Sequence, residues 1–234
     1  MKERIKNMVE KWIVDKQNKD EHRRAVANNV FYASQAGGCP RALYYKKVFG
    51  DKEFEVRALL IFQMGNIVHD FLQKEILKGE SEKSLTIQED GVVIYGRLDH
   101  IDDEEVIEIK STGAVKYNEK EASPHHLEQL NLYMKAMGRE KGRMVYVEKN
   151  TLEIVEHEVK FNPELYQKTV DNFRQVAKAV EIQVAPAKLS DYPKSWKCRY
   201  CDYKDECKTD KKPNEKLTDF VPEGSPDPQN EVKE

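Results

Sequence analysis

The sequence has no hydrophobic run long enough to cross a bilayer, no internal repeat and no Walker A loop. Hydrophobic residues account for 39% of its 234 positions and charged residues for 35%, whereas a spanning helix needs about 20 consecutive apolar residues. The run Lys110-Ser111-Thr112 lacks the glycines that precede it in a phosphate-binding loop. We therefore expect neither a membrane protein nor an ATP-driven translocase. The length suits one domain with a substantial core.

A large excess of basic residues is also missing. The 39 Lys and Arg against 42 Asp and Glu give a net charge of -3, so charge alone would not hold this chain on DNA. A protein with bound cations and local basic patches tolerates this balance, and the charge neither indicates nor excludes nucleic acid. The first residues lead into a charged amphipathic stretch, from which we expect no signal peptide and a cytoplasmic, reducing environment.

Cysteine is scarce, and its 4 residues are unevenly spaced. Cys198 and Cys201 form a CxxC pair, Cys207 follows after five residues, and Cys39 lies far upstream. Four thiolates would serve as ligands of zinc or of an iron–sulfur cluster. Zinc ribbons bring two CxxC pairs, so one remote and three bunched ligands favour a [4Fe–4S] cluster. Zinc and a pair of disulfides are the alternatives.

The most informative pattern is an aspartate followed nine residues later by a glutamate–x–lysine. Asp99 closes Gly96-Arg97-Leu98-Asp99, and Glu108 and Lys110 lie two apart in an apolar stretch. Alternate residues of a strand share one face, so Glu108 and Lys110 point together while the neighbouring isoleucines enter the core. Asp102-Asp103-Glu104 suits a turn. We therefore predict a hairpin that brings two carboxylates and an ammonium together.

Carboxylates placed close together on a strand are costly unless a cation lies between them. Oxygen ligands with retained waters suit Mg²⁺ or Mn²⁺. Asp99 and Glu108 are therefore candidate ligands of a divalent metal. The alternative for the two carboxylates and Lys110 is a solvated hairpin tip without a metal.

Hydrophobic periodicity gives the expected elements around this hairpin. Helices are expected over 2–29, 43–48, 55–78, 124–137 and 163–184, and strands over 84–90, 92–99, 105–111, 143–148 and 152–160. The central order is helix, three strands, helix, strand. Residues 208–234 are rich in Lys, Asp, Glu and Pro, which predicts a disordered tail.

Two of the expected helices carry polar residues with more than one interpretation. His69 lies in helix 55–78 on a stripe with Phe62, Gly65, Leu72 and Ile76. A histidine in such a stripe is ordinarily a satisfied core residue. Gln129 and Tyr133 lie one turn apart on the fourth helix, with His126 three residues before Gln129. Taken alone, these three form a partly exposed polar stripe.

Together these patterns resemble the iron–sulfur RecB-like nucleases of the PD-(D/E)XK superfamily, most closely the single-domain CRISPR-associated branch and its phage relatives. The resemblance covers residues 30–210, and its motifs come in the family's order. They are the cysteine before Pro40-Arg41, His69, Asp99, Glu108-x-Lys110, Gln129-x-x-x-Tyr133 and the terminal CxxCx5C. One departure is Leu98, where the superfamily often has proline before the first acidic residue.

The resemblance implies an α/β fold with a restriction-endonuclease-like core, a central mixed sheet flanked by helices, over residues 55–184. It implies one nuclease domain over 1–207, in which an iron–sulfur cluster joins 30–48 to 186–207. The implied cluster ligands are Cys39, Cys198, Cys201 and Cys207. The implied catalytic residues are Asp99, Glu108, Lys110, Gln129 and Tyr133. The implied ligands of one or two Mg²⁺ or Mn²⁺ ions are His69, Asp99, Glu108 and the Ile109 carbonyl.

The resemblance also implies cleavage of single-stranded DNA by a 5′→3′ exonuclease that processes ends for replication, recombination or repair. The host would be a bacterial, archaeal or phage-infected cell, and the partner a helicase or recombination protein. One alternative is a nuclease subunit of CRISPR spacer acquisition that acts with an integrase. Another is a non-catalytic, cluster-stabilised DNA-binding scaffold, against which the intact acidic residues argue.

A segment that mixes charge with aromatic rings is the expected contact for a single strand. Its members are residues 23–32, Arg41, Tyr44, Tyr45, Lys46 and Lys47, and His126 is a further expected contact. Ordinary surface with buried tyrosines is the alternative for this segment.

Overall fold

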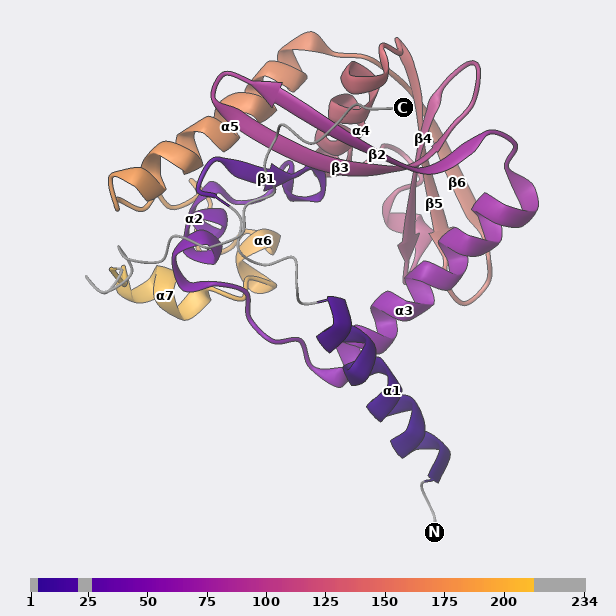
Figure 1. Cartoon of the computed structure of the whole chain (residues 1–234), viewed down its shortest axis with the longest axis horizontal. Helices are drawn as coiled ribbons and strands as arrows, with labels where there is room; N and C mark the ends of the chain where they lie inside the picture. The colour runs from indigo at the N-terminus through magenta and orange to yellow at the C-terminus, as the bar shows by residue number, and fades with distance from the viewer. Residues whose placement is uncertain (1–3, 21–26, 213–234) are drawn as a thin grey trace, which may run out of the picture.

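The structure is a computed structural model that describes residues 4–20 and 27–212 (Figure 1). Its helical elements are α1 (Arg4–Asp20), η2 (Ala33–Gln35), α2 (Pro40–Phe49), α3 (Val56–Phe71), η3 (Leu72–Ile76), η4 (Val115–Tyr117), α4 (Pro124–Met137), α5 (Pro163–Glu181), α6 (Trp196–Arg199) and α7 (Lys204–Thr209). Its strands are β1 (Val30–Tyr32), β2 (Glu80–Glu89), β3 (Val92–Ile101), β4 (Val106–Thr112), β5 (Lys141–Glu148) and β6 (Ile154–Lys160). Arg23 and Arg24, and the predicted tail beyond residue 212, lie outside the described residues.

Within the described residues the strands form one mixed, six-stranded sheet in the order β1-β3-β4-β5-β6, with β2 on the other edge of β3. β2 and β3 are antiparallel, β4 and β5 are parallel, and β5 and β6 are antiparallel. The parallel pair requires a crossover connection, and α4 supplies it. β4 begins with four consecutive buried residues, Val106 to Ile109, as a strand covered on both faces does.

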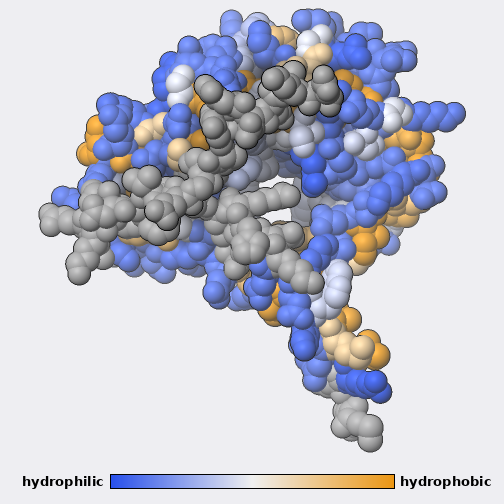
Figure 2. Space-filling view, viewed as in Figure 1, coloured by the Kyte–Doolittle hydropathy of each residue, from blue (hydrophilic) through white to orange (hydrophobic). Residues whose placement is uncertain are grey.

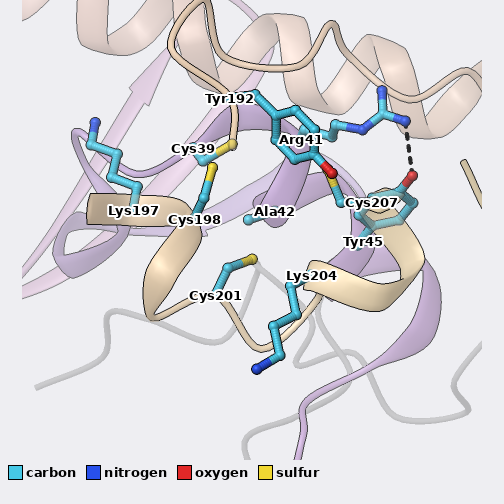
Figure 3. Close-up of a pocket in the computed structure, with 10 residues that line it drawn as sticks. All are labelled: Cys39, Arg41, Ala42, Tyr45, Tyr192, Lys197, Cys198, Cys201, Lys204 and Cys207. Carbon is cyan, nitrogen blue, oxygen red and sulfur yellow. Dashed lines mark hydrogen bonds between the residues drawn. The ribbon is translucent and has the colours of Figure 1, made fainter. Parts of the chain in front are cut away.

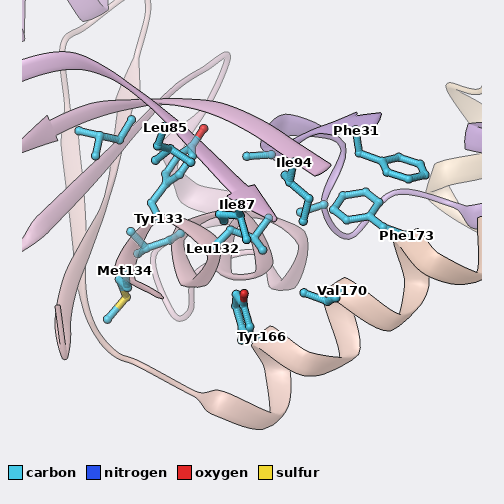
Figure 4. Close-up of a cluster of buried hydrophobic side chains, with 14 of the residues drawn as sticks. Phe31, Leu85, Ile87, Ile94, Leu132, Tyr133, Met134, Tyr166, Val170 and Phe173 are labelled. Atoms are coloured by element: carbon cyan, nitrogen blue, oxygen red, sulfur yellow. The ribbon is translucent and has the colours of Figure 1, made fainter. Parts of the chain in front are cut away.

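Helices cover both faces of β4 and β5. Ile107 and Ile109 pack with Val68 of α3 on one face. The other face continues into a larger core with α4 and α5, where the rings of Phe31 and Phe173 stack at 4.6 Å (Figure 4). Because strand residues alternate between faces, Glu108 and Lys110 point to the α4 side. This two-sided covering confirms the predicted α/β core with a mixed sheet flanked by helices.

Residues 37–50 meet the C-terminal part of the described chain at α2, α6 and α7, which lie together beside the sheet (Figure 1). The buried Tyr203 hydroxyl donates to the Gly50 carbonyl at 2.5 Å, and Lys197 Nζ donates to the Gly37 carbonyl at 2.5 Å. Arg41 donates to the Pro186 carbonyl at 2.5 Å and pairs with Asp210. These contacts connect residues 37–50 to residues 186–210 without any metal.

Helix α4 has the predicted bounds, but other expected elements differ. Of the helix expected over 2–29, the structure describes α1 (Arg4–Asp20), while residues 27–29 are not helical and the short strand β1 follows at Val30–Tyr32. The helix expected over 55–78 turns into the π-helical η3 after Phe71. Strand β2 begins at Glu80, four residues before the expected start. α7 extends beyond Cys207 to Thr209. Helix and strand type was therefore predicted better than element ends.

The predicted apolar stripe on α3 is wrong in part. Phe62 and Ile76 are exposed, whereas Leu59, Gly65 and Val68 are buried. Gly65 explains the difference, because a Cβ there would lie 2.9 Å from Ser111 Oγ. The helix therefore approaches β4 on the Gly65 face, and other apolar side chains of α1 and α3 remain exposed (Figure 2): Ile5, Met8, Val9, Trp12, Ile61, Phe62, Met64, Ile67 and Phe71. None of the helices in residues 4–20 and 27–212 is both long and apolar enough to span a membrane.

We expect Gly96→Ala to lower the free energy of unfolding by about 1–3 kcal/mol. A Cβ at Gly96 would lie 2.6 Å from Tyr133 Cε1, 3.1 Å from Ala33 Cβ and 3.2 Å from Leu85 Cδ1, so three packed side chains would have to move. Gly113→Ala is the matched control, because a Cβ there meets nothing within 4 Å. Thermal unfolding followed by circular dichroism should show a melting temperature lower by roughly 2–4 °C per kcal/mol. Equal melting temperatures of the two variants would contradict this packing.

Candidate active site

The predicted carboxylate site lies where one edge of β3, the edge that faces β1 and β4, has no strand neighbour among the described residues. On one edge of β3, β1 pairs with residues 93–95 and β4 pairs with residues 100–101. No described strand pairs with residues 96–99 on this edge. Asp99 fills the gap with its side chain, because Oδ2 accepts a hydrogen bond from the Ile109 N–H at 2.7 Å. The carboxylates therefore lie where β3 and β4 separate, two residue pairs away from the turn that joins the strands.

The pairing on the other edge of β3 is also distorted at Asp99. Glu82, the residue of β2 opposite Asp99, has a left-handed backbone with φ of 58°. Gln73 of η3 occupies this place: its Nε2 donates to the Asp99 carbonyl and to Glu82 Oε1, both at 2.8 Å. Gln73 thus positions Asp99, and the sequence analysis did not identify it. The available signal was its position four residues, or one turn, after His69, which places both side chains on the same side of the helix.

Lys110 connects the second carboxylate to α4. Its Nζ donates to Glu108 Oε1 at 2.6 Å and to Gln129 Oε1 at 2.9 Å. Gln129 Nε2 donates to the Tyr133 hydroxyl at 3.1 Å, which in turn donates to the Arg97 carbonyl in the unpaired part of β3 at 3.2 Å. The predicted residues of α4 therefore belong to the same network as Glu108 and Lys110. Their geometry holds the ammonium in one direction.

Glu108 has an unsatisfied oxygen. Its side chain is 2% exposed, and Oε2 has no hydrogen-bond partner among the described residues. Burial and the charge of Asp99 raise the pKa of Glu108 to about 7, although Lys110 opposes this rise. A buried carboxylate oxygen without a partner is costly. The donor set fits a divalent cation beside Asp99 and Glu108, because such an ion would satisfy this oxygen.

His69 reaches the site from α3, on the other face of the sheet. Its Nδ1 lies 3.3 Å from Asp99 Oδ1. Burial alone would lower the pKa of His69, but Asp99 and Glu108 raise it above its ordinary value. The Ile109 N–H faces Asp99, and the carbonyl of a strand residue points to the same edge as its N–H. In the described residues, no three His, Cys, Asp or Glu side chains already enclose a single ion.

The four cysteines line one small pocket beside Ala42 (Figure 3). Cys39 is the N-cap of α2, and the other three lie on or between α6 and α7. All four thiols are free. Burial raises the pKa of Cys198 and Cys201, and the nearby thiols of Cys39 and Cys207 raise it further. The described lining contains no carboxylate or imidazole, so this donor set suits a thiolate-bound metal centre.

The prediction that Arg41, Tyr44 and Tyr45 contact a single strand of DNA is wrong, because all three residues are buried. Tyr44 and Tyr45 are 1% and 0% exposed, so their rings are covered and cannot stack on bases. Arg41 is also buried, and Tyr45, Pro186 and Asp210 occupy its guanidinium. These residues therefore pack α2 against the C-terminal segment.

Lys47 and His126 are likewise engaged within the protein. Lys47 donates to the backbone carbonyls of Ala27 and Val30. His126 Nδ1 lies 3.0 Å from the Tyr146 hydroxyl. Burial, with smaller effects of His125 and Lys110, lowers the pKa of His126 to about 3. A neutral ring at this position is not a cationic contact for phosphate.

A family profile described as the PD-(D/E)XK nuclease superfamily matches residues 75–208, more than half of the chain. The chain belongs to this superfamily. The matched range contains Asp99, Glu108, Lys110 and the three C-terminal cysteines, whereas His69 and Cys39 precede it. Membership indicates a nuclease, an enzyme that hydrolyses phosphodiester bonds, and does not identify its substrate. No curated protein matches the chain significantly.

Solved structures include similar folds. The crystal structure of SSO0001 is 25% identical, with a TM-score of 0.60 over 87% of this chain and 95% of that one. The alkaline exonuclease LHK-Exo from Laribacter hongkongensis is 13% identical, with a TM-score of 0.45 over 64% of this chain and 87% of its own. A phage-related exonuclease from Haemophilus somnus 129PT is 13% identical, with a TM-score of 0.40 over 60% and 78%. The fold of SSO0001 is therefore similar to that of most of this chain.

Proposed function

We propose that the protein is a metal-dependent deoxyribonuclease that hydrolyses single-stranded DNA from an end, with a 5′→3′ preference. The observation that carries this proposal is the buried, unpartnered Oε2 of Glu108 beside Asp99 and Lys110. A carboxylate pair with an unsatisfied oxygen and a fixed ammonium is suited to a bound divalent cation and an anionic substrate. The superfamily membership supports phosphodiester hydrolysis as the reaction.

Asp99, Glu108, His69 and the Ile109 carbonyl would hold one or two Mg²⁺ or Mn²⁺ ions. Such ions, when bound, polarise the scissile phosphodiester and lower the pKa of a bound water. Lys110 would donate to a phosphate oxygen on which charge develops, and a preorganised donor of this kind stabilises the transition state. Gln129 and Tyr133 would hold Lys110 in the required direction through the network described above.

We propose that the four cysteines hold a [4Fe–4S] cluster that fastens α2 to α6 and α7. Zinc ribbons bring two CxxC pairs, whereas here Cys198 and Cys201 form the single CxxC pair and Cys39 is remote from it in the sequence. A four-iron cluster places each thiolate on its own iron and so holds the sulfurs further apart than a single zinc ion does. The cluster would then stabilise the C-terminal segment, at a distance from the hydrolytic residues.

The decisive experiment incubates anaerobically purified protein with end-labelled single-stranded and duplex DNA. Mg²⁺ or Mn²⁺ should produce shortened products from the single strand, and a chelator should abolish them. Label retention at each end gives the polarity, because a 5′→3′ exonuclease releases a 5′ label first. Absence of metal-dependent cleavage of either substrate would refute the proposed function.

We expect His69→Ala to weaken metal binding and to make activity require more Mn²⁺. Imidazole contributes most to the softer of the two cations, so the titration with Mn²⁺ should shift more than the titration with Mg²⁺. His100→Ala is a control of the same chemistry, because the ring of this buried histidine bonds to Ser81 and to the Lys78 carbonyl. Calorimetric titration of metal into the folded variants measures the change without reference to cleavage. Unchanged titrations would assign His69 to packing alone.

A further inference from the structure

A groove next to the cysteine pocket has a lining that the nuclease chemistry does not use. It encloses about 290 Å³ and shares Cys39 and Cys201 with the cysteine pocket. Trp196 and Tyr200 line it while remaining 53% and 75% exposed. A large aromatic ring that stays in solvent does not gain the free energy that burial of its apolar surface would give. Two of them on one groove indicate a ligand with flat, stackable groups.

The two rings lie one turn apart. Trp196 opens α6, and the Tyr200 N–H bonds to the Trp196 carbonyl at the end of that turn. Residues four apart on such a turn are neighbours on its surface. Both side chains therefore present their faces to the same groove.

A row of rings connects this groove to the nuclease site. The ring centroids of Trp196 and His125 are 5.1 Å apart, those of His125 and His126 are 3.9 Å apart, and those of His126 and Tyr146 are 5.6 Å apart. Tyr146 is the direct β5 neighbour of Lys110. The groove begins beside the cysteine pocket, and its wall packs through these rings against the strand that carries Lys110. Tyr146 is 1% exposed, so the inner end of the row is packing and not open surface.

The segment around the groove is basic although the whole chain has a net charge of -3. Residues 194–204 contain four cations and a single acid, Asp202: the cations are Lys194, Lys197, Arg199 and Lys204. Lys46 of α2 and Lys197 contribute to the lining itself. Lys46 is paired with Asp51 at 2.5 Å, whereas Lys197 bonds, among the described residues, only to the neutral Gly37 carbonyl and so keeps its positive charge unpaired there. In Figure 3 the ammonium groups of Lys197 and Lys204 point away from the thiols. These charges are therefore placed for an anionic ligand outside the cysteine pocket.

We propose that this groove binds the single strand of DNA on its way to the active site, with bases stacked on Trp196 and Tyr200 and phosphates near Lys197. Aromatic platforms flanked by cations are how proteins hold single strands without reading sequence. This inference rests on the proposed function and adds the path of the substrate to it.

The chain offers an internal optical test, because Trp12 and Trp196 are its 2 tryptophans. Trp12→Phe leaves Trp196 as the sole indole, and Trp196→Phe leaves Trp12 on α1. Oligo(dT) is titrated into each full-length variant with EDTA present, so that no metal-dependent cleavage occurs. We expect saturable quenching when Trp196 is the reporter, because a stacked base quenches indole emission. We expect no quenching when Trp12 is the reporter.

Affinity gives the second measurement. Trp196→Ala and Tyr200→Ala should each weaken oligo(dT) binding roughly 5- to 100-fold, the range that loss of one stacked base produces. Trp12→Ala is the matched control, because Trp12 is 51% exposed and Trp196 is 53% exposed. Tyr200→Ala keeps the test decisive if Trp196→Ala disturbs the stack on His125, since Tyr200 is the more exposed ring.

The outcomes separate this inference from the proposed function. If the wild-type chain cleaves and binds single strands but the Trp196 and Tyr200 variants bind as tightly as it does, the groove assignment is refuted and the nuclease stands. If the wild-type chain neither binds nor cleaves single strands, the proposed function fails together with the groove. Quenching from Trp12 but not from Trp196 would place the strand on α1 and would likewise overturn the groove.

Discussion

Glu108→Gln and Asp99→Ala should each lower DNA cleavage roughly 1,000-fold or more, because loss of one group that stabilises transition-state charge costs about 4 kcal/mol. Glu108→Gln keeps the shape of the side chain and removes its charge, so the buried site loses its means of holding a cation. Asp99→Ala also removes the acceptor of the Ile109 N–H bond, which is 2.7 Å long. Initial rates on end-labelled single strands with Mg²⁺ or Mn²⁺ measure both effects.

Thermal stability supplies a readout that does not depend on cleavage. Metal that binds only the folded state raises the wild-type melting temperature, and the rise grows with the logarithm of the metal concentration once the site is filled. This rise should vanish in Glu108→Gln. Asp103→Ala is the control, because Asp103 is an exposed acid in the turn of the same two strands. That variant should keep its activity and its metal-dependent stabilisation. A Glu108→Gln protein that cleaved at the normal rate would show that the active site is elsewhere.

Local sequence patterns predicted that Glu108 and Lys110 share one face of the sheet, because period-2 alternation places them together whatever the rest of the chain does. The interruption of β3 at Asp99 could not be read in the same way. It depends on where β1 and β4 end along one edge, and on Glu82 and Gln73 on the other. β1 is three residues long, too short for periodicity to indicate.

Burial in the α2 region was the least predictable property. Arg41, Tyr44 and Tyr45 combine charge with rings as a strand-binding surface does, yet the C-terminal segment covers them. That segment is separated from α2 by most of the chain, so its position is set by tertiary contacts. The same docking leaves Trp196 and Tyr200 exposed on the outer side. The aromatic surface therefore lies on the segment that covers α2.

Cys39→Ser should lose the cluster as completely as Cys201→Ser, despite the distance of Cys39 from the CxxC pair in the sequence. Both thiols line the same pocket, and a cluster with one ligand missing is open to solvent and oxidant. The wild-type protein, purified without air, should be brown and should carry iron and acid-labile sulfide in equal amounts. Elemental analysis and visible absorption of each variant measure the loss.

Loss of the cluster should also lower the melting temperature by on the order of 10 °C. A link across so long a loop reduces the conformational entropy of the unfolded chain, and this stabilises the folded state by about 4–5 kcal/mol. The core should stay folded, since the Tyr203–Gly50 and Lys197–Gly37 hydrogen bonds still join the two segments. Lys204→Ala is the control, because Lys204 lines the pocket without a sulfur ligand, and it should keep its iron. A colourless protein with one zinc would refute the iron assignment and leave the fastening role intact. A protein with four free thiols and no metal would refute both, and the docking of α6 and α7 on α2 would then rest on hydrogen bonds and packing alone.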